Sequence, residues 1–156
     1  MASVAFLTEE ELAAWGERVG REVEVPVVLA LNGDLGAGKS TLARAIARGA
    51  GVEGPVPSPT FNLLFRYQTP RGTVHHLDLY RLERQDDVWE LGWSDLGTGP
   101  DLVLIEWAEN ADTLLPNPRW EVTLEEYGDP ERRRVELVAV GAPPELPLFP
   151  AEGGAR

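Results

Sequence analysis

One stretch constrains this chain more than any other, the eight residues GDLGAGKS from Gly33 to Ser40. They match G-x-x-x-x-G-K-[ST], the spacing of a loop that wraps phosphate groups. An apolar run from Val27 to Leu31 precedes the loop, and apolar residues at helical spacing follow it from Leu42 onward. The stretch therefore predicts a buried strand, a glycine-rich turn and a helix whose N-terminus faces an anion.

Each fixed position of this loop has a chemical reason. Gly36 and Gly38 let the backbone approach a phosphate closely, and Ser40 supplies a hydroxyl for a magnesium ion. Lys39 supplies a compact charge for the outer phosphates, and it is the only lysine among the 14 Lys and Arg residues. We predict that the nucleotide also contacts the other residues of the loop and its first helical turn, namely Asp34, Leu35, Ala37 and Thr41.

The length and the net charge of the chain limit its domain number and the functions it can have. The 156 residues suit one domain, which we place at residues 1–141, followed by a proline-rich, extended and mobile tail at 142–156 with Leu146, Leu148 and Phe149 as docking anchors. A formal net charge of −12 argues against direct binding to nucleic acid, whose phosphates favour a basic surface. The sequence has neither a secretion signal nor a membrane-spanning run, so we expect a cytoplasmic protein without membrane contact, monomeric when alone.

Local signals predict the other elements. Thr8 and Glu11 form a capping-box pattern, so a helix is expected to begin near Glu9 and to bury Leu12, Trp15 and Val19. The sequence also predicts two hairpins and one further strand, at 61–68 with 73–79, at 120–126 with 133–140, and at 102–107.

Three further stretches of the sequence carry candidates for the site. Thr60 stands about twenty residues after Lys39, where a hydroxyl can sense a terminal phosphate, although a plain Ser-Pro-Thr turn explains it equally well. Along the strand 73–79, a period of two places His76, Asp78 and Tyr80 on one face. Glu106 ends a run of four apolar residues, as does the carboxylate that holds magnesium or orients water beside a phosphate loop.

The run Arg132 to Arg134 has two interpretations. It could close over phosphates as a lid. The alternative, which we favour, is cross-strand pairing with Glu121, Glu125 or Glu126 on the preceding strand.

Four motifs together resemble the TsaE family, formerly called YjeE, over about residues 5–140. They are the phosphate loop through Thr41, SPTF at 58–61, HLDLYRL at 76–82 and IEW at 105–107. The resemblance implies a small bacterial Mg²⁺-dependent ATPase that acts with TsaD and TsaB to make threonylcarbamoyladenosine beside the anticodon of tRNA. It also implies an α/β fold of the P-loop NTPase type, a three-layer sandwich whose mixed sheet is parallel at its centre and carries antiparallel hairpins.

The same resemblance implies roles for individual residues. Lys39, Ser40 and Thr41 would hold phosphates and magnesium, and Thr60 would be the switch hydroxyl. Asp78 and Glu106 would serve the metal or the attacking water, with Trp107 near the nucleotide. ATP is favoured over GTP, because the guanine-recognition motif of GTPases needs a second lysine, which this chain lacks.

Two other functions stay open at this point. A small-molecule kinase would also use a phosphate loop, with the arginine run as its lid. A nucleotide-gated assembly module would use ATP to control binding to partners, with little turnover.

Overall fold

A computed structural model of the chain describes residues 2–34, 36–56 and 64–150. Two α-helices, α1 (Glu9–Glu22) and α2 (Lys39–Gly49), accompany one sheet in this part of the chain. The strands of the sheet are, in chain order, β1 (Ala2–Thr8), β2 (Val27–Asn32), β3 (Leu64–Thr69), β4 (Gly72–Asp78), β5 (Asp101–Glu106), β6 (Arg119–Glu126) and β7 (Arg132–Val140). Single-turn or two-turn 3₁₀ helices lie between β4 and β6, at η1 (Gln85–Leu91), η2 (Trp93–Asp95), η3 (Ala108–Asn110) and η4 (Asp112–Leu114).

The sheet is parallel at its centre and antiparallel at both sides. Its strand order is β1-β7-β6-β2-β5-β4-β3. The strand β2 runs parallel to β5 and β6, and β4 runs parallel to β5. Antiparallel pairing joins β3 to β4, β6 to β7 and β1 to β7, which confirms both predicted hairpins and the predicted mixed α/β fold. The carboxyl ends of β2, β4 and β5 therefore meet at one edge of the sheet, where ligands of α/β folds bind.

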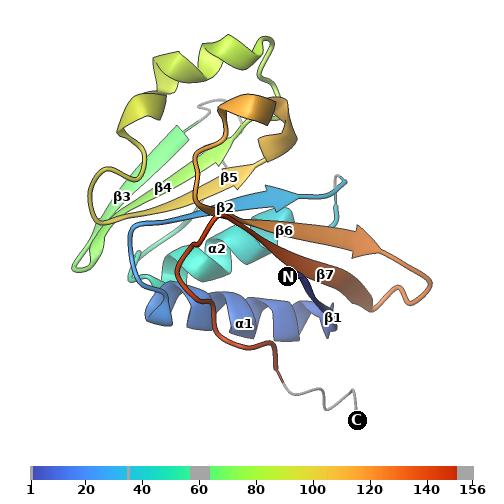
Figure 1. Cartoon of the computed structure of the whole chain (residues 1–156). Helices are drawn as coiled ribbons and strands as arrows, with labels where there is room; N and C mark the ends of the chain where they lie inside the picture. Colours follow the sequence, from blue (N-terminus) through green and yellow to red (C-terminus); the bar gives the residue numbers. More distant parts are fainter. Residues whose placement is uncertain (1, 35, 57–63, 151–156) are drawn as a thin grey trace.

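Helices cover both faces of the sheet and complete three layers (Figure 1). The helices α1 and α2 bury one face in an apolar cluster that includes Leu12, Trp15 and Val19, as the sequence predicts. The 3₁₀ segments cover the other face over β2, β5 and β4, where Val88 and Trp93 pack. In this part of the chain, neither α-helix is both long and apolar enough to span a membrane.

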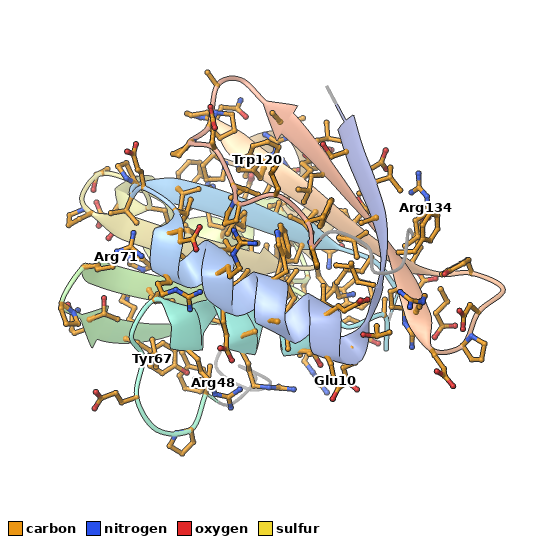
Figure 2. All side chains as sticks on the ribbon, turned by 90° about the horizontal axis from the view of Figure 1, so that it is seen from below. Glu10, Arg48, Tyr67, Arg71, Trp120 and Arg134 are labelled. Atoms are coloured by element: carbon orange, nitrogen blue, oxygen red, sulfur yellow. The ribbon has the colours of Figure 1, made fainter. Side chains whose placement is uncertain are left out.

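The helix α1 begins where the capping box predicts. The Thr8 hydroxyl accepts a hydrogen bond from the Glu11 backbone N–H, and the Glu11 carboxylate accepts one from the Thr8 N–H. Gly20 lets α1 press against the backbone of α2, because a Cβ at Gly20 would collide with the carbonyl group of Ile46. This close packing sets the position of α2 beneath the sheet (Figure 2).

The chain after β7 runs extended along the helical layer. The indole N–H of Trp15 donates to the Pro147 carbonyl at 3.0 Å, and that of Trp120 donates to the Pro144 carbonyl at 2.7 Å. Of the three expected anchors, Leu146 and Phe149 pack against the core, whereas Leu148 is 84% exposed. These contacts anchor residues 144–149 to the domain. The rest of the tail, residues 151–156, lies outside the described residues.

Candidate functional site

The loop between β2 and α2 has the backbone that its glycines require. Gly33, Gly36 and Gly38 have φ angles of 142°, 85° and 108°, a region that residues with a side chain rarely adopt. A Cβ at Gly33 would also collide with the backbone carbonyl of Leu124 on β6. Leu35, which we expected to contact the nucleotide, lies outside the described residues.

The N-terminus of α2 lacks an internal cap. Its N-cap residue is Gly38, and the first turn carries no acidic residue; within residues 2–34, 36–56 and 64–150, no side chain forms a capping hydrogen bond there. The first backbone N–H groups of a helix have no intrahelical partners, and they lie at the positive end of the helix dipole. The arrangement is that of an anion site in which the ligand takes the place of the cap.

Lys39, the first residue of α2, folds back onto the loop. Its ammonium group donates to the carbonyl of Gly33 and, at 3.3 Å, to that of Asp34. It also lies 3.5 Å from the centre of the Trp107 ring, and the whole residue is only 4% exposed. Burial lowers the pKa of Lys39 below its usual value, although the carboxylates of Glu109, Glu106, Asp78 and Asp34 oppose this effect. Among the residues that the structure describes, the ammonium group thus has no directly bonded anion, and a phosphate would supply one.

The parallel pairing of β4 and β5 brings together the two predicted carboxylates. Asp78 and Glu106 are direct register partners at the ends of their strands. Glu106 is 2% exposed, and its Oε1 accepts a hydrogen bond of 3.0 Å from the Ser40 hydroxyl. Its Oε2 lies 2.6 Å from Nε2 of His76. The hydroxyl of the loop and the carboxylate of the apolar strand, 66 residues apart in sequence, are therefore in direct contact.

Asp78 is less deeply buried and is held by its own turn. Its Oδ1 accepts the backbone N–H of Tyr80 at 3.0 Å. Burial raises the pKa of the Asp78 carboxyl, and Glu106 adds to this effect, whereas the Tyr80 N–H, His76 and Lys39 oppose it. A carboxylate that is costly to ionise in the free protein would be relieved by a nearby cation.

Trp107 covers the phosphate loop from the β5 side. It has a left-handed backbone, with φ of 57°, where the chain turns from β5 into η3. Its ring lies over Lys39 on one side and packs against Tyr80, with 4.9 Å between the ring centres. Of the predicted polar trio on β4, His76 and Asp78 enter the site, while Tyr80 lies beyond the strand and reaches it through Trp107. Thr60, the proposed switch hydroxyl, lies outside the described residues.

A cavity of about 370 Å³ adjoins the outer side of the loop. Its lining combines the loop and α2 with the start of α1 and the turn between β6 and β7, and includes Leu12, Gly36, Gly38, Thr41 and Arg133. The position of the β6–β7 turn beside the phosphate loop was not predicted from the sequence. The only signal was the interpretation of the arginine run as a phosphate-closing lid.

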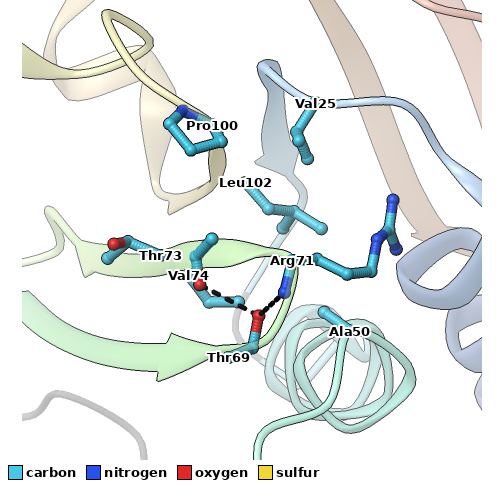
Figure 3. A pocket seen from close by; sticks show the side chains of 9 residues that line it. Val25, Ala50, Thr69, Arg71, Thr73, Val74, Pro100 and Leu102 are labelled. Carbon is cyan, nitrogen blue, oxygen red and sulfur yellow. Dashed lines mark hydrogen bonds between the residues drawn. The ribbon is translucent and has the colours of Figure 1, made fainter.

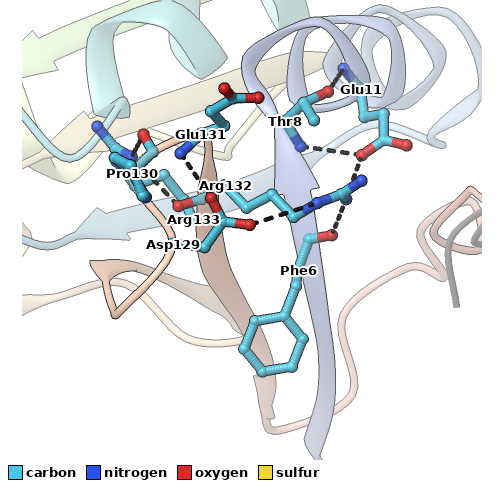
Figure 4. A network of polar contacts seen from close by, with 8 residues as sticks. All are labelled: Phe6, Thr8, Glu11, Asp129, Pro130, Glu131, Arg132 and Arg133. Atoms are coloured by element: carbon cyan, nitrogen blue, oxygen red, sulfur yellow. Dashed lines mark hydrogen bonds and ion pairs between the residues drawn. The ribbon is translucent and has the colours of Figure 1, made fainter.

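Two arginines of the run pair as the favoured interpretation predicted, and the third has other partners. Arg133 pairs with Glu126 and Arg134 with Glu125, as expected for cross-strand neighbours. Arg132 instead donates to Glu11 of α1 at 3.1 Å and to the Phe6 carbonyl of β1 at 3.0 Å (Figure 4). Glu121, another expected partner of the run, pairs with Arg119. Arg132 thus ties the β6–β7 turn to the start of α1 and holds two walls of the cavity together.

A second cavity lies near the start of β5 and has a different character (Figure 3). Its volume is about 10 Å³, enough for one water molecule. The Arg71 guanidinium beside it donates to the carbonyls of Gly20, Arg21 and Val23 at the end of α1. This cavity is a packing gap beside a helix cap.

Comparison with known proteins agrees with the geometry of the phosphate loop and the carboxylates facing it. The family model described as threonylcarbamoyl adenosine biosynthesis protein TsaE matches residues 6–135. The chain belongs to the TsaE family. Among its relatives, the tRNA threonylcarbamoyladenosine biosynthesis protein TsaE of Rickettsia bellii is 40% identical over 126 residues, which cover 80% of this chain and 87% of the relative. The protein of the same name from Haemophilus influenzae is 38% identical over 116 residues, 74% of this chain and 72% of the relative.

A solved structure extends the likeness to the fold. The crystal structure of YdiB from Bacillus subtilis superposes with a TM-score of 0.72 at 29% sequence identity, covering 90% of this chain and 88% of YdiB. The fold of YdiB therefore covers nearly the whole chain, and the loop, the carboxylates and the cavity all lie within residues 6–135, which the TsaE family model matches.

Proposed function

We propose that this TsaE-family protein binds and hydrolyses ATP with Mg²⁺, in support of threonylcarbamoyladenosine synthesis on tRNA. One observation carries the proposal. The uncapped N-terminus of α2 and the Ser40–Glu106 contact of 3.0 Å form adjacent sites for an anion and for a cation. A nucleotide phosphate chain with its magnesium ion is the ligand that needs both.

The backbone amides of the loop and of the first turn of α2 would bind the phosphates. Lys39 would exchange its carbonyl contacts with Gly33 and Asp34 for phosphate oxygens. This exchange gives the buried ammonium group an anionic partner in place of two backbone carbonyls. Trp107, whose ring lies 3.5 Å from the Lys39 ammonium group, would lie against the bound phosphates.

The oxygen atoms of Ser40, Glu106 and Asp78 are of the kind that binds magnesium. Mg²⁺ binds oxygen ligands, commonly one or two carboxylates together with nucleotide phosphates and water. The Ser40 hydroxyl and the Glu106 and Asp78 carboxylates are such oxygen donors, and the last two stand side by side in the sheet. When bound, the metal would neutralise charge on the phosphates, while Glu106 and Asp78 would hold it or orient the attacking water.

The cavity of about 370 Å³ would take the nucleoside end of ATP. It adjoins Gly36, Gly38 and Thr41, so a nucleotide whose phosphates lie on the loop would place its base there. Arg133 and Pro130 would then line the base and ribose. Adenine is the favoured base, because Lys39 is the only lysine and no guanine-recognition motif is possible.

The proposed partners are the TsaD and TsaB proteins. The net charge of −12 disfavours a direct grip on tRNA, so the protein would act on the enzymes that modify it, in the cytoplasm. Hydrolysis by the isolated protein should be slow, because positioning and charge neutralisation are its main resources. Arg81, which is exposed just after the Asp78 strand, would act as an arginine finger when contact with a partner orders the site.

The primary test is Lys39→Ala. ATP hydrolysis should fall by about 100-fold or more, because removing one such donor to a developing charge typically has that effect. Phosphate release and ATP affinity would be measured beside wild type and an Arg71→Ala control, remote from the loop. Unchanged hydrolysis in Lys39→Ala would disprove the assignment.

A second experiment tests the biological role. Purified TsaD, TsaB and unmodified tRNA would be supplied with the substrates of the modification, with this protein, with its Lys39→Ala variant or with neither. Repeated turnover should require the wild-type protein. Equal yields in all three reactions would contradict the role in tRNA modification while leaving the ATPase activity standing.

A further inference from the structure

Among the residues that the structure describes, His76 is the one fully buried polar side chain at the site for which the proposed function gives no role. It has 0% exposure on β4, next to Leu104 of β5 in the sheet register. A buried imidazole costs free energy unless its nitrogen atoms find partners. The contacts of the two ring nitrogens therefore decide how much free energy the buried His76 ring costs.

One nitrogen of the ring holds Glu106. Nε2 of His76 lies 2.6 Å from Oε2 of Glu106, while Oε1 of the same carboxylate accepts the Ser40 hydroxyl at 3.0 Å. The torsion that turns a carboxylate about its last carbon–carbon bond is otherwise soft. With Oε2 held by His76, Oε1 stays directed at the loop hydroxyl.

The other nitrogen is buried without a partner. Nδ1 of His76 finds no hydrogen-bond partner within the part of the chain that the structure describes. An unpaired acceptor is less costly than an unpaired N–H, so the contacts assign the proton to Nε2, which donates to Glu106. An apolar side chain of similar size would fill the same space without a buried unpaired nitrogen. Packing alone therefore does not account for histidine at this position.

We propose that His76 is a positioning residue that aims Glu106 at Ser40 and so prepares the magnesium site. This inference rests on the proposed function, because it concerns the same ion. Residues that orient metal-binding side chains from behind typically change metal affinity or activity by 10- to 100-fold when they are replaced. Asp78 is oriented separately, by the Tyr80 backbone N–H, so the effect of His76 should pass through Glu106.

His75 provides a matched control on the same strand. It is also buried, and it lies 3.2 Å from a carboxylate, that of Asp101, but at the start of β5, away from the loop. Because side chains alternate along a strand, His75 faces the opposite side of the sheet. A His75→Leu variant therefore reports the cost of removing a buried histidine without touching Glu106.

The experiment measures how nucleotide binding depends on Mg²⁺. A non-hydrolysable ATP analogue would be titrated by calorimetry into wild type, His76→Leu, His76→Gln and His75→Leu, over a range of Mg²⁺ concentrations and in EDTA. In His76→Leu the half-saturating Mg²⁺ concentration should rise about 10- to 100-fold, with affinity in EDTA nearly unchanged. His76→Gln, whose amide can replace Nε2 as donor, should recover most of the loss, and His75→Leu should match wild type.

Different failures have different meanings. If wild type binds the analogue in a Mg²⁺-dependent way and His76→Leu shows the same dependence, the role of His76 is overturned while the proposed function stands. If His76→Gln is as defective as His76→Leu, the donor is irrelevant and the inference also fails. If wild type itself does not bind the analogue, the proposed function falls and the inference falls with it. Should His76→Leu not fold, His76→Asn, whose amide is too short to reach Glu106, should show the same rise in Mg²⁺ requirement, and a wild-type response there would overturn the proposal.

Discussion

The two α-helices of this protein begin in opposite ways. The N-terminus of α1 is satisfied by its own residues, through the capping box of Thr8 and Glu11, and carries three glutamates in its first turn. The N-terminus of α2 has Gly38 as its cap and no acidic residue in its first turn, and the described part of the chain supplies no side-chain capping bond. Both helix ends are partially positive, so both favour negative charge. The N-terminus of α1 receives negative charge from its own glutamates, whereas that of α2 is open to an anionic ligand.

This difference separates stability from function. The internal cap of α1 stabilises the fold at all times, whereas the open end of α2 is complemented only when an anion binds. The groups around α2 are correspondingly costly, since burial disfavours the charged forms of both Lys39 and Asp78. A substitution at the α2 end should therefore lower nucleotide affinity, and one at the α1 end should lower stability, which Gly38→Ala and Thr8→Ala test. A third variant, Asp78→Asn on β4, tests the cost of the buried groups around α2.

The largest effect is expected for Gly38→Ala. Alanine is strained at a φ of 108°, at a cost of about 1–3 kcal/mol, and its Cβ would lie 3.3 Å from Leu12 of α1. Relief of that strain would turn the loop amides away from the phosphates, so ATP affinity should fall at least about 10-fold. Calorimetry with the ATP analogue would measure the affinity, and urea unfolding the stability.

Gly99→Ala is the control for this variant. Gly99 lies outside the left-handed region and has open space for a Cβ. It should bind the analogue as wild type does. Wild-type affinity in Gly38→Ala would mean that the open end of α2 is not the phosphate site.

An intermediate effect is expected for Thr8→Ala. Loss of a side-chain N-cap costs about 1 kcal/mol of folding free energy, so the urea midpoint should fall. Nucleotide affinity in excess Mg²⁺ should stay unchanged, because the cap satisfies only α1. A large loss of affinity in Thr8→Ala would break the comparison and show that the two helix ends are coupled.

The smallest effect on stability is expected for Asp78→Asn, and it has the opposite sign. Burial raises the pKa of Asp78 in the folded protein above the usual 3.8, which the unfolded chain keeps. Between the pKa of the unfolded chain and that of the folded protein, the folded protein therefore holds more protons. Wild-type stability therefore falls as pH rises through this window, and the cost persists above it. The neutral asparagine avoids the cost, so the ligand-free variant should be more stable than wild type at about pH 7.

Urea unfolding at about pH 7 and at about pH 3 checks this expectation. The advantage of Asp78→Asn should vanish at the lower pH, where the wild-type carboxyl is protonated in both states. Hydrolysis of ATP should also fall in this variant. A variant less stable than wild type at neutral pH would show that the hydrogen bonds of Asp78 outweigh its burial.

Local patterns in the sequence predicted both α-helices, six of the seven strands and most of the candidate residues, but not β1 (Ala2–Thr8). The loop from Gly33 to Ser40, the cap formed by Thr8 and Glu11, and both hairpins depend on residues only a few positions apart. Turn, cap and period-two signals act at that range, so one sequence is enough to predict them. The chemistry of the loop likewise depends on side chains that are adjacent in the chain.

Only the tertiary structure decided how the distant parts meet. The order of the strands makes Asp78 and Glu106 register partners and brings Glu106 to Ser40. It also brings the β6–β7 turn to α1, where Arg132 pairs with Glu11 rather than across its own hairpin.

Packing of Leu146 and Phe149 against the core was predicted from the sequence, but the hydrogen bonds that hold the C-terminal segment could not be predicted, for a related reason. Trp15 and Trp120 donate to backbone carbonyls, which every residue carries and which leave no pattern in the sequence. The sequence by itself thus determined which groups are available to a phosphate and a metal ion. The parallel pairing of β2, β4 and β5 decided that those groups share one edge of the sheet, because long-range strand pairing arises from burial of the whole core and not from any local signal.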